Sequence, residues 1–468
     1  MLPVDSASSR FDSEPPPRLF PTTAMDPLVG LDEVDWSTLN HAYGSANDIP
    51  AIIRQLAQPD LDLEQLRGIY RNLYANLYHQ GTRYSASVAA VPFLIAIVDT
   101  PTTYRRDQLL SYLTSLAVSD PSSLVMHGFN IAELRAAMDQ VLEEGYVERE
   151  NEKRAQYISE AANEEERKDR EMEFMFSGSI ESGVEETIID VQVYDAVKSG
   201  LPVYRRLLKD ASARVRSMAA FTIAWFSEEI EENSQALFEF VQNEQDGAAR
   251  ATGLVALGIL QTTLHATPAE NASSPIGQRI SEVFTQTQQG DLAHFCAALG
   301  MGMLNISQPE HLDEILRKVS DPTYLENFES RQLDASTAFP FADPNIMSLA
   351  SSALGSVKGS ENPSVPLALA KALPSSRGET TLFITTIALR TAFDHTPPAP
   401  TNKPEQLPPF ESLTVVQQEV IRALTQVDSF NWMFANFMSI LRGWGLYSGL
   451  AQLQRYAGIE PDPAPPSP

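Results

Sequence analysis

The sequence predicts an all-α fold in which antiparallel helix pairs stack into an α-solenoid. Asp210 lies four residues before Arg214, and about one repeat length further on Asp246 lies four residues before Arg250. Each aspartate stands where a helix N-cap is expected, because its carboxylate can accept from the free amides of the first turn. Self-similarity at a period of roughly 35–45 residues is typical of helical repeats.

The helices that follow these aspartates are apolar on most of their circumference. Small and apolar residues fill Ser217–Ile223 and Gly253–Ile259, and Asp291–Leu304 has the same pattern at a looser spacing. Small side chains let one helix approach another closely, and a helix that is apolar all round must be covered on both sides. We therefore expect these segments to be the inner helices of stacked repeats.

A proline followed by an apolar stripe marks four expected helix starts, at Pro50, Pro92, Pro202 and Pro366. Proline suits the first helical turn, where the missing amide would have no partner in any case. Apolar spacing predicts further helices in the same chain. Their expected ranges are 63–78, 104–118, 131–143, 234–241, 246–260, 346–357, 366–373 and 380–393.

Each open end of such a stack needs a cover, because terminal repeats have no neighbour on one side. We expect a short helix within 31–50 to cover the first end, and the aromatic region 413–457 to close the other. Residues 262–275 and 394–409 are rich in Pro, Thr and Ser, which predicts surface loops.

Composition divides the chain into one long helical domain and two tails. Residues 1–25 predict a disordered N-terminal tail, 26–458 the α-solenoid, and 459–468 a Pro-rich C-terminal tail. From about 143 to 182 the chain is dominated by Glu, Lys and Arg, which predicts a solvated, partly helical insertion between repeats. The functional alternative for this insertion is an acidic docking arm.

The chain is strongly acidic, with 61 acidic and 34 basic residues and a net charge of −27. This field repels a phosphate backbone and an anionic membrane surface, so we expect neither partner and favour a basic protein partner. The single Cys296 fits a reducing compartment. No apolar run reaches the roughly 20 residues of a membrane helix, and no secretory signal is visible. We expect a cytoplasmic protein.

Sequence patterns for common catalytic and metal sites are missing. There is no phosphate-binding loop, no nucleophile elbow and no H-E-x-x-H pair, and one cysteine cannot build a Cys-rich zinc site. His294 and Cys296 are two residues apart, so they do not share a helix face. We therefore expect no catalytic residues, no metal and no cofactor.

Two groups of residues are candidates for binding a partner. His79, Arg83 and Tyr84 surround a glycine loop between two apolar helices, and polar loop residues often carry function. The structural alternative is that His79 lies at the preceding helix C-terminus and Thr82 caps the next helix. Arg442 and Trp444 form the second group, since Arg and Trp are common interface anchors; a Trp that closes the terminal cap is the alternative.

Three strings resemble a group of largely uncharacterised HEAT-repeat-containing proteins. They are Trp36–Pro50 (WSTLNHAYGSANDIP), His79–Leu94 (HQGTRYSASVAAVPFL), and LTVVQQEVIRAL with LRGWGL inside Leu413–Leu446. The resemblance implies an ARM/HEAT-type superhelix and a role in interactions, and it supplies no catalytic residues. The charged insertion and the Pro-rich tails are additions to the pattern of that group.

Two functions follow as hypotheses. The first is a non-enzymatic scaffold that binds a protein partner on a concave surface. The alternative is an enzyme or ligand-binding protein of the helical-repeat type, lyase-like, with a polar cleft near His79, Arg83 and Tyr84. Self-association through the aromatic C-terminal region is a further possibility, and the sequence leaves the oligomeric state open.

Overall fold

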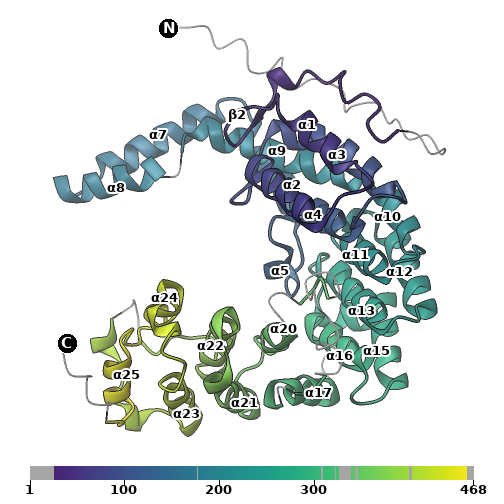
Figure 1. The fold of residues 1–468 in the computed structure, drawn as a ribbon. Coiled ribbons are helices and arrows are strands. Elements are labelled where there is room, and N and C mark those ends of the chain that lie inside the picture. The colour runs from purple at the N-terminus through teal and green to yellow at the C-terminus, as the bar shows by residue number, and fades with distance from the viewer. Residues whose placement is uncertain are drawn as a thin grey trace.

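Helices form most of the chain in the computed structural model (Figure 1), which describes residues 26–460 except 177, 307–308, 322, 326–338, 343–345 and 400–402. Strands within these residues amount to two small hairpins. The prediction of an all-α chain is confirmed at this level. The tail predicted at 1–25 lies outside the described residues, and so do residues 461–468 of the C-terminal tail.

The N-terminal part combines four helices with the two hairpins. Strands β1 and β2 pair antiparallel, as do β3 and β4. The elements are η1 (Trp36–Thr38), β1 (Asn40–His41), β2 (Gly44–Ser45), α1 (Ile49–Leu56), α2 (Leu63–Asn76), β3 (Tyr78–His79), β4 (Thr82–Arg83), α3 (Ser85–Asp99) and α4 (Arg106–Val118).

The short helix expected within 31–50 is present only as the three-residue 3₁₀ helix η1, and much of the rest of this segment forms turns and the first hairpin. Polar side chains bind its backbone in place of a helical ladder. Asp35 accepts from the Ser37 amide at 3.2 Å, and the Nδ1 atom of His41 accepts from the Tyr43 amide at 3.0 Å. Gly44 then turns the chain at a φ of +121°, a value that glycine adopts readily.

After α4 the chain continues through five helices, of which the third and fourth lie outside the main body (Figure 1). It forms α5 (Pro121–Leu124), α6 (Ile131–Val141), α7 (Tyr146–Ser159), α8 (Glu164–Phe176) and α9 (Ile180–Lys198). We call α7 and α8, which cover most of the predicted charged insertion, the arm; Figure 1 shows it projecting from the body. Helix α9 packs against α3, α4 and α6 and so returns the chain to the body.

Ring contacts hold the two helices of the arm together. The guanidinium carbon of Arg154 lies 4.4 Å from the Phe174 ring centroid, and that of Arg170 lies 4.2 Å from the Tyr157 centroid. Helix α7 contains no fully buried residue. The arm is therefore stabilised by side-chain pairs on a solvated surface rather than by an apolar core.

The central part continues as alternating helices. They are α10 (Leu201–Leu207), α11 (Ala213–Ile223), η2 (Ser227–Glu229), α12 (Ile230–Asn243), α13 (Gly247–Thr262), α14 (Pro268–Ser273), α15 (Pro275–Gln286), α16 (Leu292–Met303) and α17 (Pro309–Ser320).

The part that we call the C-terminal limb spans residues 346–457. Its elements are α20 (Ile346–Ala353), α21 (Ser364–Ala372), η3 (Leu373–Ser375), α22 (Gly378–Ala392), η4 (Pro404–Gln406), η5 (Phe410–Ser412), α23 (Val415–Leu424), η6 (Asn431–Met433), α24 (Ala435–Gly443) and α25 (Leu450–Tyr456).

One set of helices forms a continuous series of contacts through the molecule. In this series α4 packs on α11, and α13, α16, α20, α22 and α24 follow, each on the one before. Figure 1 shows the body as an open curve with α20, α22 and α24 toward the opening and α17, α21 and α23 on the outside. We call the side facing the opening the inner side. Glycine favours close approach within the series: a Cβ atom on Gly258 would lie 3.1 Å from the Met303 sulfur, which is tighter than most Cβ contacts.

Of the two helix N-caps predicted at aspartates, one is confirmed and one is wrong. Asp246 caps α13 by accepting from the amides of Ala248 and Ala249, both at 3.0 Å, as predicted. The matching prediction for Asp210 is wrong, because Ser212 is the N-cap of α11 and Asp210 accepts from Arg106 at 2.6 Å.

The helix starts predicted from prolines are likewise confirmed in some cases and wrong in another. Pro50 and Pro202 lie in the first turns of α1 and α10, as predicted, and Pro366 lies in the first turn of α21. Pro92 lies inside α3, which begins at Ser85. The apolar stripe after Pro92 was thus the second half of a longer helix, whose first half is rich in Ala and Ser.

Candidate functional site

Arg83, a predicted binding residue, lies inside the molecule. Its side chain is 7% exposed, its Nε donates to the Leu116 carbonyl at 2.9 Å, and a terminal nitrogen donates to Asp190 at 3.0 Å. These bonds connect the second hairpin to α4 and α9. A partner in solution cannot reach a side chain that is buried and bonded in this way. Arg83 therefore stabilises the fold rather than a complex.

Asp190 completes this buried contact from α9. Burial raises the pKa of its carboxyl above the usual aspartate value, and the Arg83 guanidinium opposes that shift. Loss of Arg83 would leave a partly buried carboxylate without its cation, which is a costly arrangement.

His79 and Tyr84 remain partly exposed, and the structure places Tyr43 beside His79. The Tyr43 hydroxyl lies 3.4 Å from the His79 Nε2, and the two ring centroids are 5.5 Å apart. The first hairpin, which carries Tyr43, is also bonded to the end of α2, since the Ala42 amide donates to the Asn76 carbonyl at 3.0 Å. Sequence reasoning missed Tyr43, which lies in the segment 31–50 that was predicted as a short helix, although its place before Gly44 was a signal.

Tyr84 is the N-cap residue of α3, and its own amide donates to the Ser87 hydroxyl at 3.0 Å. Thr82 lies in β4, so the expectation that it caps the helix is wrong. Burial raises the pKa of the Tyr84 hydroxyl, with further increases from Glu186 and Tyr43. His79, Tyr84 and Tyr43 thus form a polar surface group without Arg83.

Arg442 and Trp444 lie at the other end of the chain. Arg442 is exposed at the end of α24, and its Nε donates to the Met438 carbonyl at 3.3 Å. Trp444 is partly buried, with its ring centroid 6.1 Å from that of Phe393. Trp444 therefore connects α24 to α22, while Arg442 stays available. Figure 1 places this group and the hairpins in opposite parts of the curve.

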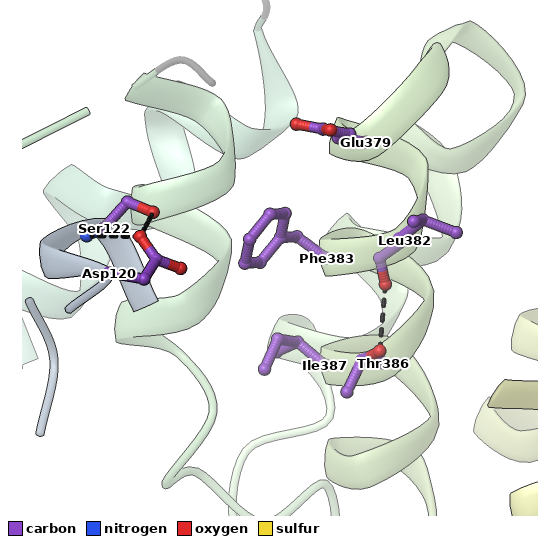
Figure 2. Close-up of a pocket in the computed structure, with 7 residues that line it drawn as sticks. All are labelled: Asp120, Ser122, Glu379, Leu382, Phe383, Thr386 and Ile387. Atoms are coloured by element: carbon purple, nitrogen blue, oxygen red, sulfur yellow. Dashed lines mark hydrogen bonds between the residues drawn. The ribbon is translucent and has the colours of Figure 1, made fainter. Parts of the chain in front are cut away.

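The inner side of α22 carries a stripe of side chains that other helices do not fully cover. Glu379, Leu382, Phe383 and Thr386 are exposed or partly exposed and follow the spacing of one helix face, which the buried Ile387 continues. Together with Asp120 and Ser122 they line a hollow of about 390 Å³ (Figure 2). We call it the α5–α22 hollow; its two walls come from segments that are far apart in the sequence.

Local hydrogen bonds fix Asp120 at the edge of this hollow. Its Oδ1 accepts from the Ser122 amide at 3.1 Å and from the Ser122 hydroxyl at 2.6 Å, which caps α5. The turn after α5 is pinned against α13 at Gly128, where an added Cβ would lie 2.7 Å from the Thr263 nitrogen. Because Gly128 has a φ of +72°, both conformation and space require glycine there.

Three large side chains are exposed next to α24. Phe430 is 54% exposed, Met433 71% and Phe434 41%, and the rings of Phe430 and Phe434 meet edge to face with centroids 4.8 Å apart. We call them the aromatic patch. Exposed apolar residues that gather in one place are typical of interaction surfaces.

His294 and Cys296, which the sequence analysis considered together, lie in packed surroundings. No three His, Cys, Asp or Glu side chains in the described part of the chain come close enough to hold a metal ion. Cys296 is fully buried, which raises the pKa of its thiol, and His294 stacks on Phe284 with centroids 4.2 Å apart. His294 and Cys296 therefore belong to the packing of α15 and α16.

Comparisons with protein families, curated proteins and solved structures found no match to this chain. Among the described helices, none has both the length and the apolar character that crossing a bilayer requires.

Proposed function

We propose that the chain is a HEAT-like α-solenoid, a scaffold without catalytic activity that binds a protein partner on the inner side of its curve. The helix series from α4 to α24 and the alternation of inner and outer helices support a repeat architecture. Open curved stacks of this kind offer long surfaces whose specificity comes from side chains on the inner helices. The resemblance of the hairpin segments to HEAT-repeat-containing proteins agrees with this proposal.

The exposed inner face of α22 is the observation that carries the proposal. Leu382 and Phe383 remain partly exposed on it, next to the hollow, while Ile384 and Thr385 on the opposite face are buried. A helix whose function is only to complete the core would have its apolar stripe covered. The aromatic patch beside α24 extends the apolar surface of the same limb.

Charge points to a basic partner. The net charge of −27 produces a field that attracts cations, and both charged residues in the lining of the α5–α22 hollow are acidic. Such complementarity acts mainly on the association rate and on the choice of partner. The proposal places this binding in the cytoplasm.

The alternative of an enzyme or ligand-binding cleft near His79 and Tyr84 is weaker than the scaffold proposal. That hypothesis uses Arg83 as a binding cation, and Arg83 is engaged by Leu116 and Asp190. A ligand there would have to bind through Tyr43, His79 and Tyr84 alone. Small-molecule screening followed by His79→Ala is the appropriate test if no protein partner exists.

The experiment is capture of a partner from the native cell extract, followed by reconstitution of the complex from purified components. The inner variant is Leu382→Ser/Phe383→Ser, which changes partly exposed residues of α22 that line the hollow. The matched control is Leu367→Ser/Val415→Ser, which changes exposed residues on α21 and α23. We expect the inner variant to weaken binding by about tenfold or more and the control to change it by less than about threefold. Loss of binding only in the control, or capture of no stoichiometric partner, would contradict the proposal.

A further inference from the structure

We propose that the α5–α22 hollow binds one arginine side chain presented by the protein partner. This inference rests on the proposed function and adds the chemistry that the partner must carry. The hollow has an apolar wall on α22 and one carboxylate on each side, Asp120 before α5 and Glu379 in the first turn of α22.

The apolar wall suits the stem and the plane of an arginine. Leu382, Phe383 and Ile387 lie on the face of α22 that lines the hollow, and Figure 2 shows the Phe383 ring pointing across the gap toward Ser122. The methylene groups of an arginine can pack along such a surface while its charged head remains at the polar edge. A guanidinium also stacks favourably on an aromatic ring.

The two carboxylates supply the opposite charge. Asp120 and Glu379 are both exposed, and the lining of the hollow contains no lysine or arginine that would neutralise them. The Oδ1 atom of Asp120 accepts from Ser122, and Figure 2 shows the other carboxylate oxygen directed away from Ser122. An incoming cation therefore meets carboxylate groups that lack a basic partner in the lining.

Arginine fits this arrangement better than lysine does. Its planar guanidinium has five donors in a fixed geometry, so it can form two parallel hydrogen bonds to a carboxylate while its plane lies on a ring. A lysine ammonium is a compact, strongly hydrated charge that uses an aromatic wall less well. We therefore expect arginine to bind most tightly and lysine more weakly.

The hollow is held in shape before any partner arrives. Asp120 is fixed by its bonds to Ser122, and the segment after α5 is pinned on α13 by the close approach of Gly128 to Thr263. On the other wall, the Thr386 hydroxyl donates to the Leu382 carbonyl at 2.9 Å within α22. A site that needs little ordering on binding loses less affinity to conformational entropy.

The test uses helical alanine-based peptides that differ at one central residue, namely arginine, lysine, citrulline or norleucine. Citrulline keeps the shape of arginine without its charge. Binding of each fluorescently labelled peptide to the full-length protein is measured by anisotropy. We expect the arginine peptide to bind about tenfold more tightly than the citrulline peptide, the factor for one charge-assisted hydrogen bond. Equal binding of these two peptides would overturn the proposal.

The matching protein variant is Asp120→Asn/Glu379→Gln, which removes both charges and keeps the α5 cap, because asparagine also caps helices well. Its control is Asp139→Asn/Glu232→Gln, which removes the same two charges from exposed positions on α6 and α12. We expect the first variant to abolish the preference for arginine over citrulline and the control to retain it. Loss of the preference in both variants would mean that it depends on the net charge of the protein and not on these two positions. That result would contradict a defined site.

The arginine site and the scaffold function can fail separately. If Asp120→Asn/Glu379→Gln binds the reconstituted partner as wild type does, and the peptides bind equally, the arginine site is wrong and the scaffold function stands. If no partner is captured, the scaffold function falls, while a preference for the arginine peptide would still support the hollow as a guanidinium site.

Discussion

The central helices and the C-terminal limb belong to the same series of contacts, yet their inner sides differ. In α13 every residue from Ala251 to Gln261 is buried, which covers about three turns on all sides. In α22, by contrast, Leu382, Phe383 and Thr386 stay partly exposed. The same type of helix is thus enclosed in one region and open on one face in the other.

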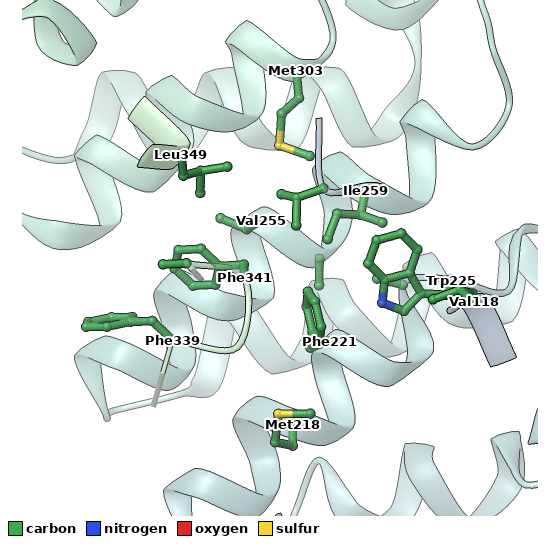
Figure 3. Close-up of a cluster of buried hydrophobic side chains, with 14 of the residues drawn as sticks. Val118, Met218, Phe221, Trp225, Val255, Ile259, Met303, Phe339, Phe341 and Leu349 are labelled. Atoms are coloured by element: carbon green, nitrogen blue, oxygen red, sulfur yellow. The ribbon is translucent and has the colours of Figure 1, made fainter. Parts of the chain in front are cut away.

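The chain covers its own central helices with segments that lie between helices of the series. Phe339 and Phe341 join the buried cluster that contains Val255 of α13 and Leu349 of α20 (Figure 3). The turn after α5 adds Val125, which is 1% exposed, and Gly128 against the end of α13. Position in the series therefore does not decide whether an inner helix is enclosed or open on one face; coverage by other segments does.

The largest expected effect is at Phe341. Phe341→Ala should lower the free energy of unfolding by about 4 kcal/mol, because a large side chain that is 1% exposed leaves a cavity in the central cluster. Phe383→Ala in the limb should cost less than about 1 kcal/mol, since its ring is partly exposed. Urea denaturation followed by circular dichroism measures both. Equal costs would remove the distinction between the two regions.

The next largest effect on stability is at Arg83, whose buried ion pair can be compared with an exposed one. Arg83→Met should cost about 3 kcal/mol at pH 7, because Asp190 then remains partly buried without its cation. Arg54→Met removes a pair with the exposed Asp32 and should cost less than about 0.5 kcal/mol. Urea denaturation of the two variants compares these costs directly.

The pH dependence of the Arg83 variant follows from the raised pKa of Asp190. The native state holds its proton at a pH where the unfolded chain has already lost it. The penalty from ionised Asp190 is therefore present at pH 7 and is lost as the pH falls through the raised pKa. We expect Arg83→Met to cost less at pH 4.5 than at pH 7; a cost that grows on acidification would contradict this assignment.

A smaller effect separates two glycines. A Cβ on Gly253 of α13 would lie 2.7 Å from a Val241 methyl carbon and 2.9 Å from the Phe240 ring, whereas a Cβ on Gly443 of α24 would meet nothing within 4 Å. Gly253→Ala should therefore destabilise the protein by about 1–2 kcal/mol. Gly443→Ala should be neutral or stabilise it by up to about 1 kcal/mol, through helix propensity. Thermal denaturation of both variants would show shifts of opposite sign.

The smallest effect is at the edge of the hollow. Asp120→Ala removes the cap of α5 and should cost about 1 kcal/mol, while Asp120→Asn should cost only a few tenths. Both variants should lose the preference for the arginine peptide, because both lack the carboxylate. If Asp120→Asn kept that preference, Glu379 alone would carry the charge recognition.

The sequence predicted most central helices because their local patterns agree with their final packing. The cap at Asp246 and the apolar run of α13 are examples, since a helix that is buried on all sides has apolar residues on all sides, and these can be recognised in the sequence. The hairpins were missed because His41 and Asp35 bind the backbone through polar side chains, which apolar periodicity does not report. The cap predicted at Asp210 was wrong because its partner Arg106 is far away in the sequence, and local patterns do not report such a pair.

Most of the candidate site could not be predicted from the sequence. Arg83 looked like a loop cation, and only the fold shows that Leu116 and Asp190 occupy it. The α5–α22 hollow brings together residues near 120 and near 380, and no local pattern connects these segments. Its apolar wall was visible within the predicted helix 380–393, but which face would stay exposed depends on coverage by other segments.

The most direct test of the account is hydroxyl-radical footprinting of the reconstituted complex. Side-chain oxidation is compared with and without partner at Leu382 and Phe383 of α22, and at Leu367 and Val415 on the outer helices of the limb. We predict that the partner protects Leu382 and Phe383 at least severalfold and leaves Leu367 and Val415 unchanged. Protection confined to Leu367 and Val415 would contradict binding on the inner side.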